Sequence, residues 1–221
     1  MDQFEVADNC LQIGGRSLTR LAEQVGSTPF YAYDRSVMAA QVAKLRTTLP
    51  PGIHLHYAMK ANPMPEVVKH LAGLTEGLDV ASAGELAVAL ATGTDPRDIS
   101  FAGPGKSHQD LEAAVASDVI INMESEGEMA RIAALATASG SRPRVAIRVN
   151  PDFELKTSGM KMSGGPKPFG VDAERVPAML ADLAALPLDF MGFHIFSGSQ
   201  NLRPEAIIEA QSKTFEPVSY T

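Results

Sequence analysis

Strand-like and helix-like patterns alternate along this chain from Thr28 onward, and this alternation restricts the fold more than any other feature. Helix-like runs repeat apolar residues every three or four positions, as in residues 35–49 and 176–183. Short β-rich runs separate them at residues 53–60, 78–81, 99–102, 119–122, 144–149 and 188–196. Such strand-helix repetition predicts a parallel sheet with right-handed crossovers.

The faces of two strands favour a closed barrel over an open sheet. The run 144–149 has one apolar face (Val145, Ile147, Val149), while Arg144 and Arg148 lie on the other. The run 53–60 likewise separates Tyr57 and Met59 from His54, His56 and Lys60. A central strand of an open sheet is covered by helices on both faces and should be apolar on both. With no Gly-x-Gly-x-x-Gly fingerprint present, we predict an α/β fold of the (β/α)8 TIM-barrel type.

The strand count falls short of a closed barrel. Six strands are predicted, or seven if residues 30–34 form one, whereas closure needs eight. An unclosed parallel sheet leaves a bare edge, which is an aggregation liability. We therefore expect an incomplete barrel in a truncated chain.

Composition and charge exclude several classes of protein. The net charge of −7 argues against nucleic acid or an anionic membrane as a partner. Cys10 is the single cysteine, so the sequence predicts neither a disulfide nor a metal site. The N-terminus does not resemble a signal peptide, and no run approaches the roughly 18 apolar residues of a membrane span. A cytoplasmic protein is expected.

Two helix starts match the capping-box pattern. Ser82 is followed three residues later by Glu85, and Ser125 by Glu128. In this motif the serine and the acidic side chain satisfy exposed backbone N–H groups reciprocally. This structural role accounts for Glu85, which we give no catalytic role.

Lys60 at the end of the run 53–60 is the strongest candidate for a nucleophile. A lone lysine at a strand end is in most cases simply solvated. A barrel interior, however, would partly desolvate the amine, lower its pKa and make it reactive toward an aldehyde. Catalytic groups of barrel enzymes lie at such strand ends.

A second candidate segment is residues 192–200. His194 and Phe196 share one face of the strand and could lie against a flat aromatic ligand, although both could instead be ordinary core residues. The turn that follows contains Gly198 and Ser199, whose backbone N–H groups could approach a phosphate, although a plain turn is the alternative.

Three further polar residues follow strand ends. Arg148 could bind a phenolate or a carboxylate through its planar fork of donors, or form a structural ion pair. Asp79 also lies at a strand end. Lys106 ranks below Lys60, because a glycine-flanked loop lysine is usually solvated.

In this order, the segments resemble the fold-type III pyridoxal-phosphate (PLP) decarboxylases, the family of diaminopimelate and ornithine decarboxylases with an alanine-racemase-like barrel. The resemblance spans roughly residues 28–202. It rests on Pro-Phe-Tyr-Ala-Tyr-Asp at 29–34, Tyr-Ala-Met-Lys-Ala-Asn at 57–62, Asp-Val-Ala-Ser-Ala-Gly-Glu at 79–85, Phe-Ala-Gly-Pro-Gly-Lys at 101–106, Asn-Met-Glu-Ser-Glu-Gly-Glu at 122–128, Arg-Val-Asn-Pro at 148–151 and Gly-Ser-Gln at 198–200.

The resemblance implies roles for these residues. Lys60 would form the internal aldimine with PLP, Asp79 would lie near the cofactor, and Ser199 in its glycine-serine turn would bind the phosphate. Arg148 matches the family's strand-end arginine. The reaction would be decarboxylation of an amino acid, with the pyridine ring of PLP accepting the electrons. A homodimer is implied as well.

Two of the departures from the family pattern bear directly on the site and on activity. Many relatives carry a ring-stacking histidine where this chain has Phe196, and His194 lies two residues earlier, so either could stack on the cofactor. The Gly-rich phosphate loop, the Glu-Pro-Gly-Arg segment and the C-terminal β-domain of the family are missing. We thus expect residues 1–27 to be a segment that packs with that β-domain, residues 28–221 to be the barrel, and the chain to have little or no activity.

Three alternatives remain. A racemase on the same barrel would usually follow its lysine with Ala-(Asn/Asp)-Ala-Tyr-Gly, whereas Ala61-Asn62-Pro63 follows Lys60. A PLP carrier protein made of one barrel fits the length but should close all eight strands. An inert regulatory fragment of a decarboxylase is the third.

Overall fold

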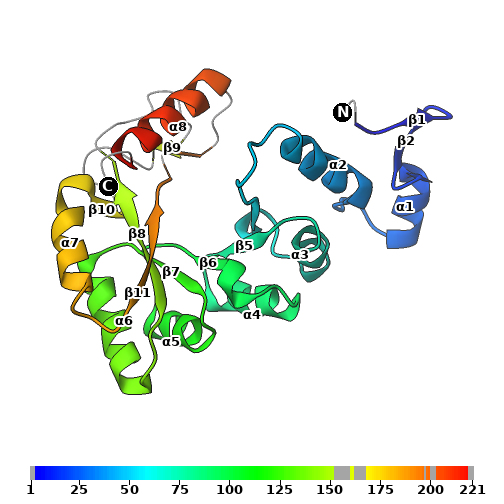
Figure 1. The fold of residues 1–221 in the computed structure, drawn as a ribbon. Coiled ribbons are helices and arrows are strands. Elements are labelled where there is room, and N and C mark those ends of the chain that lie inside the picture. Colours follow the sequence, from blue (N-terminus) through cyan, green and yellow to red (C-terminus); the bar gives the residue numbers. More distant parts are fainter. Residues whose placement is uncertain (1–2, 152–159, 162–167, 197, 200–202, 219–221) are drawn as a thin grey trace.

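The fold was analysed in a computed structural model of all 221 residues. It describes residues 3–151, 160–161, 168–196, 198–199 and 203–218. A curved parallel sheet lined by helices forms most of this part, and a small N-terminal unit lies beyond it (Figure 1). The predicted incomplete α/β barrel is confirmed.

Within the described residues, the main sheet contains six parallel strands in the order β4-β5-β6-β7-β8-β11. Their bounds are β4 His56–Ala58, β5 Gly77–Val80, β6 Ile99–Phe101, β7 Ile120–Met123, β8 Arg144–Asn150 and β11 Asp189–His194. The short strand β10 (Val171–Asp172) pairs in parallel with the end of β8. Apart from β10, these strands follow chain order, as each returns to the sheet after a helix.

Alternation along the strands separates a helix-covered face from an inner face. On β8, Val145 and Ile147 are fully buried in the hydrophobic core. Leu78 of β5, Phe101 of β6 and Ile121 of β7 join the same core. The helices that cover this face are α3 Pro65–Ala72, α4 Ala83–Ala91, α5 His108–Ala116, α6 Glu126–Ser139 and α7 Val176–Leu183, which form an arc around the sheet (Figure 1).

Three helix starts show how the sequence directs local structure. At α4 and α6, the hydroxyls of Ser82 and Ser125 accept hydrogen bonds from the N–H groups of Glu85 and Glu128, as predicted. The two glutamates, however, accept from the residue before the N-cap, since Ala81 donates to Glu85 and Glu124 to Glu128. A complete capping box occurs at Ser107, which starts α5. In α6 the Glu128 carboxylate therefore accepts from the backbone of Glu124, the residue before the N-cap Ser125.

Several predicted elements differ from the structure. The strand predicted for 53–60 is limited to His56–Ala58, because β5 pairs with only these three residues, and Lys60 lies in the 3-10 turn Met59–Ala61. Residues 30–34 form no strand; Asp34 instead caps α2 (Arg35–Arg46) by accepting from Ser36 N at 2.8 Å. The apolar face predicted for α2 is not buried, and Leu45 is 48% exposed.

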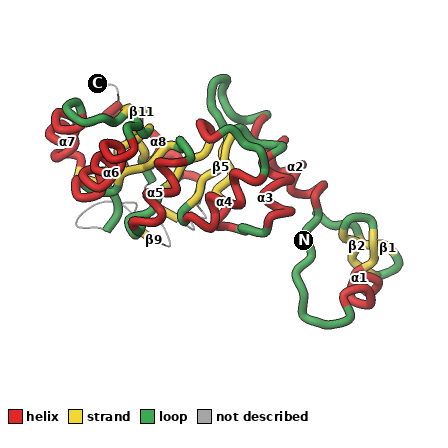
Figure 2. The backbone as a smooth tube through the Cα atoms, turned by 90° about the horizontal axis from the view of Figure 1, so that it is seen from below, coloured by secondary structure: helices red, strands yellow, loops and turns green. Residues whose placement is uncertain are grey.

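The two ends of the described chain carry smaller elements. Strands β1 Val6–Ala7, β2 Cys10–Ile13 and β3 Arg16–Ser17 form an antiparallel sheet beside α1 Leu18–Val25. Figures 1 and 2 both show this unit beyond α2 at one end of the molecule. Near the other end, β12 Gly198–Ser199 pairs with β9 Met160–Lys161, and α8 Pro204–Val218 follows. Within the described ranges, no helix combines the length and the apolar character needed to cross a membrane.

Removing the largest core side chain tests the contribution of this packing. Phe101 is fully buried, so we expect Phe101→Ala to lower the free energy of unfolding by about 3–5 kcal/mol through lost contacts and a cavity. The matched control Phe215→Ala, at a side chain that is 65% exposed, should cost less than about 0.5 kcal/mol. Urea unfolding followed by circular dichroism measures both, and equal losses would contradict the assignment of the core.

Candidate active site

A cavity of about 680 Å³ lies on the inner face of the sheet, which is the face opposite the helices. Its walls come from all six main strands and from the residues that follow them. Five of the predicted site residues line it: Lys60, Asp79, Arg148, His194 and Phe196. Residues between 60 and 196 are thus brought into a single cavity by the parallel strands.

Lys60 reaches this cavity from the turn after β4. Its Nζ lies 5.2 Å from the centroid of the Phe196 ring, within the range of a cation–π contact. The Lys60 side chain is exposed. The prediction that a barrel interior partly desolvates its amine is therefore wrong for this structure. The described strands leave the cavity open on one side, and solvent reaches the amine there.

A chain of polar side chains crosses the inner face from β4 to β7. His56 Nδ1 lies 3.4 Å from Asp79 Oδ1, and the same oxygen accepts a 2.7 Å hydrogen bond from the Ser100 hydroxyl. Asn122 Nδ2 donates to Ser100 Oγ at 3.4 Å. The hydrogen bond to Asp79 raises the pKa of His56. Burial raises the pKa of Asp79, but hydrogen bonds from His56 and Ser100 outweigh it and hold that pKa below the usual value.

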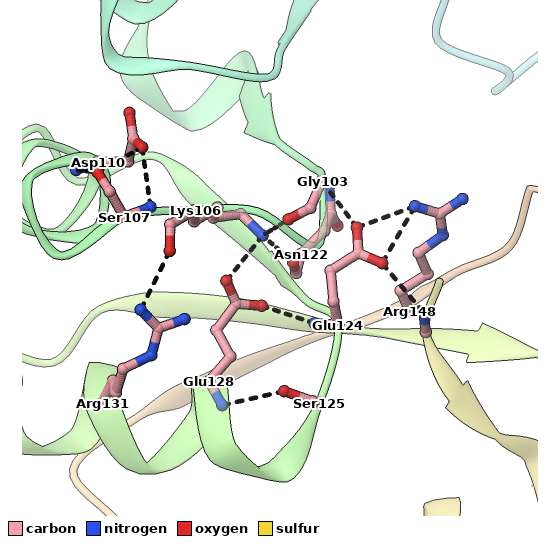
Figure 3. Close-up of polar contacts among 11 residues, drawn as sticks. Gly103, Lys106, Ser107, Asp110, Asn122, Glu124, Ser125, Glu128, Arg131 and Arg148 are labelled. Carbon is pink, nitrogen blue, oxygen red and sulfur yellow. Dashed lines mark hydrogen bonds and ion pairs between the residues drawn. The ribbon is translucent and has the colours of Figure 1, made fainter. Parts of the chain in front are cut away.

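Arg148 at the end of β8 is buried, and one of its nitrogens is held by an acidic partner. Nη1 donates to both oxygens of Glu124, at 2.9 and 3.1 Å (Figure 3). The guanidinium carbon lies 4.8 Å from the centroid of the Phe169 ring. The ion pair considered for Arg148 therefore exists, and it occurs at the cavity wall.

Lys106 differs from its prediction, because it is buried rather than solvated. Its Nζ donates to the carbonyl oxygens of Gly103 and Asn122, both at 2.8 Å, and to Glu128 Oε1 at 3.1 Å (Figure 3). Burial lowers the pKa of Lys106, and the Glu128 carboxylate opposes this shift. Two of the three acceptors, Asn122 and Glu128, come from other segments of the chain, so the burial of Lys106 cannot be inferred from its own loop.

His194 and Phe196 both line the cavity, so the structure does not choose between them as the ring-stacking residue. His194 pairs with Arg148 across β11 and β8. Its Nδ1 is buried, and no hydrogen-bond partner for this atom exists among the described residues. Burial, and then the neighbouring Arg148 charge, lower the pKa of His194 to about 4.

Gly198 and Ser199 form β12, which pairs with β9 in a separate two-stranded ladder. Among the described residues that line the cavity above, Gly198 does not occur. Their predicted contact with a phosphate stays a prediction.

The predictions gave no site role to three residues at or near the cavity: His56, Asn122 and Glu124. For His56 a signal existed, since the alternation of residues 53–60 places it on the same face as Lys60. For Glu124 the sequence offered no indication of a site role, because this residue stands between the end of β7 and the N-cap Ser125 of α6.

Comparison with known proteins identifies the family. The model of the pyridoxal-dependent decarboxylases, pyridoxal binding domain, matches residues 35–219. The chain belongs to this family. Its cofactor is therefore pyridoxal phosphate, and the predicted cofactor and family are confirmed.

Individual relatives agree with this membership. The chain is 38% identical to the L-glutamyl-[BtrI acyl-carrier protein] decarboxylase of Niallia circulans, over 86% of this chain and 45% of that protein. It is 36% identical to the diaminopimelate decarboxylase of Aquifex aeolicus, over 95% and 50%. A crystal structure of diaminopimelate decarboxylase from Helicobacter pylori complexed with L-lysine superimposes with a TM-score of 0.80 at 32% identity, over 91% and 52%. The chain spans about half the length of the relatives it matches.

The residues that line the cavity fit the cofactor of this family. A primary amine (Lys60) can bind an aldehyde, and Phe196 and His194 offer ring faces to a flat heterocycle. The buried Nδ1 of His194 lacks a described partner, and a polar ligand atom could supply one.

The titration of His194 leads to a prediction about stability. The folded state holds this pKa at about 4, against about 6.5 for an unfolded histidine, so between these values the unfolded chain binds more protons. Stability should accordingly fall as the pH falls from about 6.5 to about 4, by roughly 3 kcal/mol from this group.

Urea unfolding between pH 4 and 7 measures this loss. His194→Gln should lose less stability than the native chain over that range, because glutamine does not titrate. His108→Gln is the matched control, at a histidine on the exposed surface of α5. If His194→Gln and the native chain lost stability equally, the burial of a neutral His194 would be contradicted.

Proposed function

We propose that this domain holds pyridoxal phosphate through Lys60 and serves the decarboxylation of an amino acid. The observation that carries the proposal is the single cavity in which Lys60, Asp79, Arg148, His194 and Phe196 meet at the ends of parallel strands. Active sites of barrel enzymes occupy this end of the sheet. Membership of the pyridoxal-dependent decarboxylases supports the same reaction class.

Each residue has a task that follows from its chemistry. The Lys60 amine holds the cofactor covalently, and either His194 or Phe196 packs against the cofactor ring. Arg148 presents positive charge at the cavity wall and favours an anionic group there. Asp79 keeps a low pKa and stays ionised, so it can accept hydrogen bonds or balance a positive charge. When bound, the cofactor accepts the electrons released as carbon dioxide leaves.

Other parts of the proposal rest on the family resemblance. Gly198 and Ser199 would contact the cofactor phosphate through their turn. Residues 1–27, which include the small antiparallel sheet, would pack on a β-domain, and the active protein would be a cytoplasmic homodimer. The names of the relatives, which include diaminopimelate and acyl-carrier-protein-linked glutamyl decarboxylases, support an amino-acid substrate.

Covalent labelling tests the role of Lys60. The chain is incubated with pyridoxal phosphate, reduced with borohydride and digested, and the modified peptide is mapped by mass spectrometry. We expect the phosphopyridoxyl group on Lys60 and its loss in Lys60→Arg, because arginine forms no stable adduct with the aldehyde. The matched control Lys69→Arg, at an exposed lysine of α3, should keep the label on Lys60. A label at another lysine alone, or none, would overturn the assignment.

A second prediction concerns turnover. The 221 residues span about half the length of their relatives, and the described residues leave the Lys60 side chain exposed to solvent. We therefore expect cofactor binding with little or no release of carbon dioxide from ornithine, arginine or diaminopimelate, because an open site excludes water poorly. Release of labelled carbon dioxide measures this. Robust turnover by the 221-residue chain, lost in Lys60→Arg, would show that these residues suffice for catalysis.

A further inference from the structure

Four charged side chains form a buried group at and behind the cavity wall, which we call the charge cluster: Lys106, Glu124, Glu128 and Arg148. Each side chain is at most 6% exposed. Two positive and two negative charges balance within the group. Burying ionised groups is costly unless each is paired and hydrogen-bonded, and here every member has such a partner.

Glu124 is the centre of the cluster, and its carboxylate accepts from three separate segments (Figure 3). Oε1 accepts from Gly103 N at 2.7 Å and Oε2 from Gly170 N at 3.0 Å, while Arg148 Nη1 donates to both oxygens. Gly103 follows β6, and Gly170 precedes β10. These contacts fix the carboxylate, which in turn fixes the guanidinium.

Gly170 lies where only glycine fits. Its φ is +76°, in the left-handed region, and a Cβ there would lie 2.7 Å from the carbonyl oxygen of Arg148. The backbone of residue 170 can therefore approach β8 closely enough for its N–H group to reach Glu124. The aromatic neighbour Phe169 then covers the Arg148 guanidinium.

Lys106 and Glu128 support Glu124 from the other side. Glu128 Oε2 accepts from the backbone N–H of Glu124 at 2.7 Å, and Glu128 Oε1 accepts from Lys106 Nζ. The backbone of Glu124 is thus held as firmly as its side chain. Arg131 ties the loop further, since its Nη1 donates to the carbonyl oxygen of Lys106 at 3.0 Å.

We propose that Glu124 is the positioning residue of the site: it holds the Arg148 guanidinium at the cavity wall beside His194. Glu124 does not line the cavity, so it acts through Arg148. The positioning of Arg148 by Glu124 does not depend on the proposed function. Only its consequence does, namely that the fixed guanidinium receives an anionic group of the cofactor.

The titration of His194 in the ligand-free protein distinguishes positioning from charge alone. Arg148 lowers the pKa of His194 more than Glu124 raises it. If Glu124 supplied only charge, Glu124→Gln would lower the pKa of His194 below about 4. If Glu124 holds Arg148 in place, the same variant releases the guanidinium, and the pKa of His194 rises.

We therefore expect the pKa of His194 to rise in Glu124→Gln. NMR titration of the ligand-free protein with labelled histidines measures this pKa. Glu126→Gln is the matched control, two residues away, where the exposed Arg175 is the ion-pair partner at 2.7 Å. It should leave the titration unchanged. A fall or no change in Glu124→Gln would overturn the proposal. If Glu124→Gln does not fold, Glu124→Asp replaces it: a rise supports positioning, and an unchanged pKa overturns it.

A double-mutant cycle links the inference to the cofactor. We expect Glu124→Gln to weaken pyridoxal phosphate binding roughly tenfold in the native background and by less than about twofold in an Arg148→Gln background. Equal losses in both backgrounds would overturn action through Arg148. If the native protein holds no cofactor on Lys60, the proposed function fails, while the His194 titration still decides the positioning role.

Discussion

The structure depends on the alternation of side chains along its parallel strands. On β8, Val145 and Ile147 pack under the helices, while Ala146 and Arg148 face the cavity. The same division on the other strands gathers the apolar core on one side and polar groups on the other. A shift of one residue in any register would exchange the two sets. The strand register therefore fixes the core and the site together: once one face of the sheet packs under the helices, the opposite face must carry the site.

This constraint explains how much could be predicted. That Lys60, Asp79, Arg148, His194 and Phe196 line one cavity could be predicted, because each lies on or just after a strand. The period of two decides the face of the sheet, and the chain order decides the end. The extent of β4 could not be found in this way, because it depends on how many residues β5 can pair. The apolar face of α2 was predicted from its spacing, but spacing does not say whether another element covers it.

The charge cluster marks the limit of sequence reasoning. Lys106 has glycine and proline neighbours and reads as a loop lysine, yet its surroundings are the carbonyl oxygens of Gly103 and Asn122. Glu124 and Gly170 are 46 positions apart and meet only when β8 and β10 pair. No local pattern carries that information. The exposure of Lys60 is likewise a property of the open cavity and not of its own segment.

The charge cluster also has a consequence for the order in which the chain can fold. Its members come from the loop after β6, the segment after β7 and the end of β8, so no two adjacent strands bring all four together. A folding intermediate that buried Glu124 before β8 had docked would leave a carboxylate desolvated and without its arginine, at a high cost in free energy. Such intermediates are disfavoured, and β6, β7 and β8 should consolidate in one cooperative step. The charges that orient Arg148 in the native state thus also disfavour folding intermediates in which Glu124 is buried without its partner.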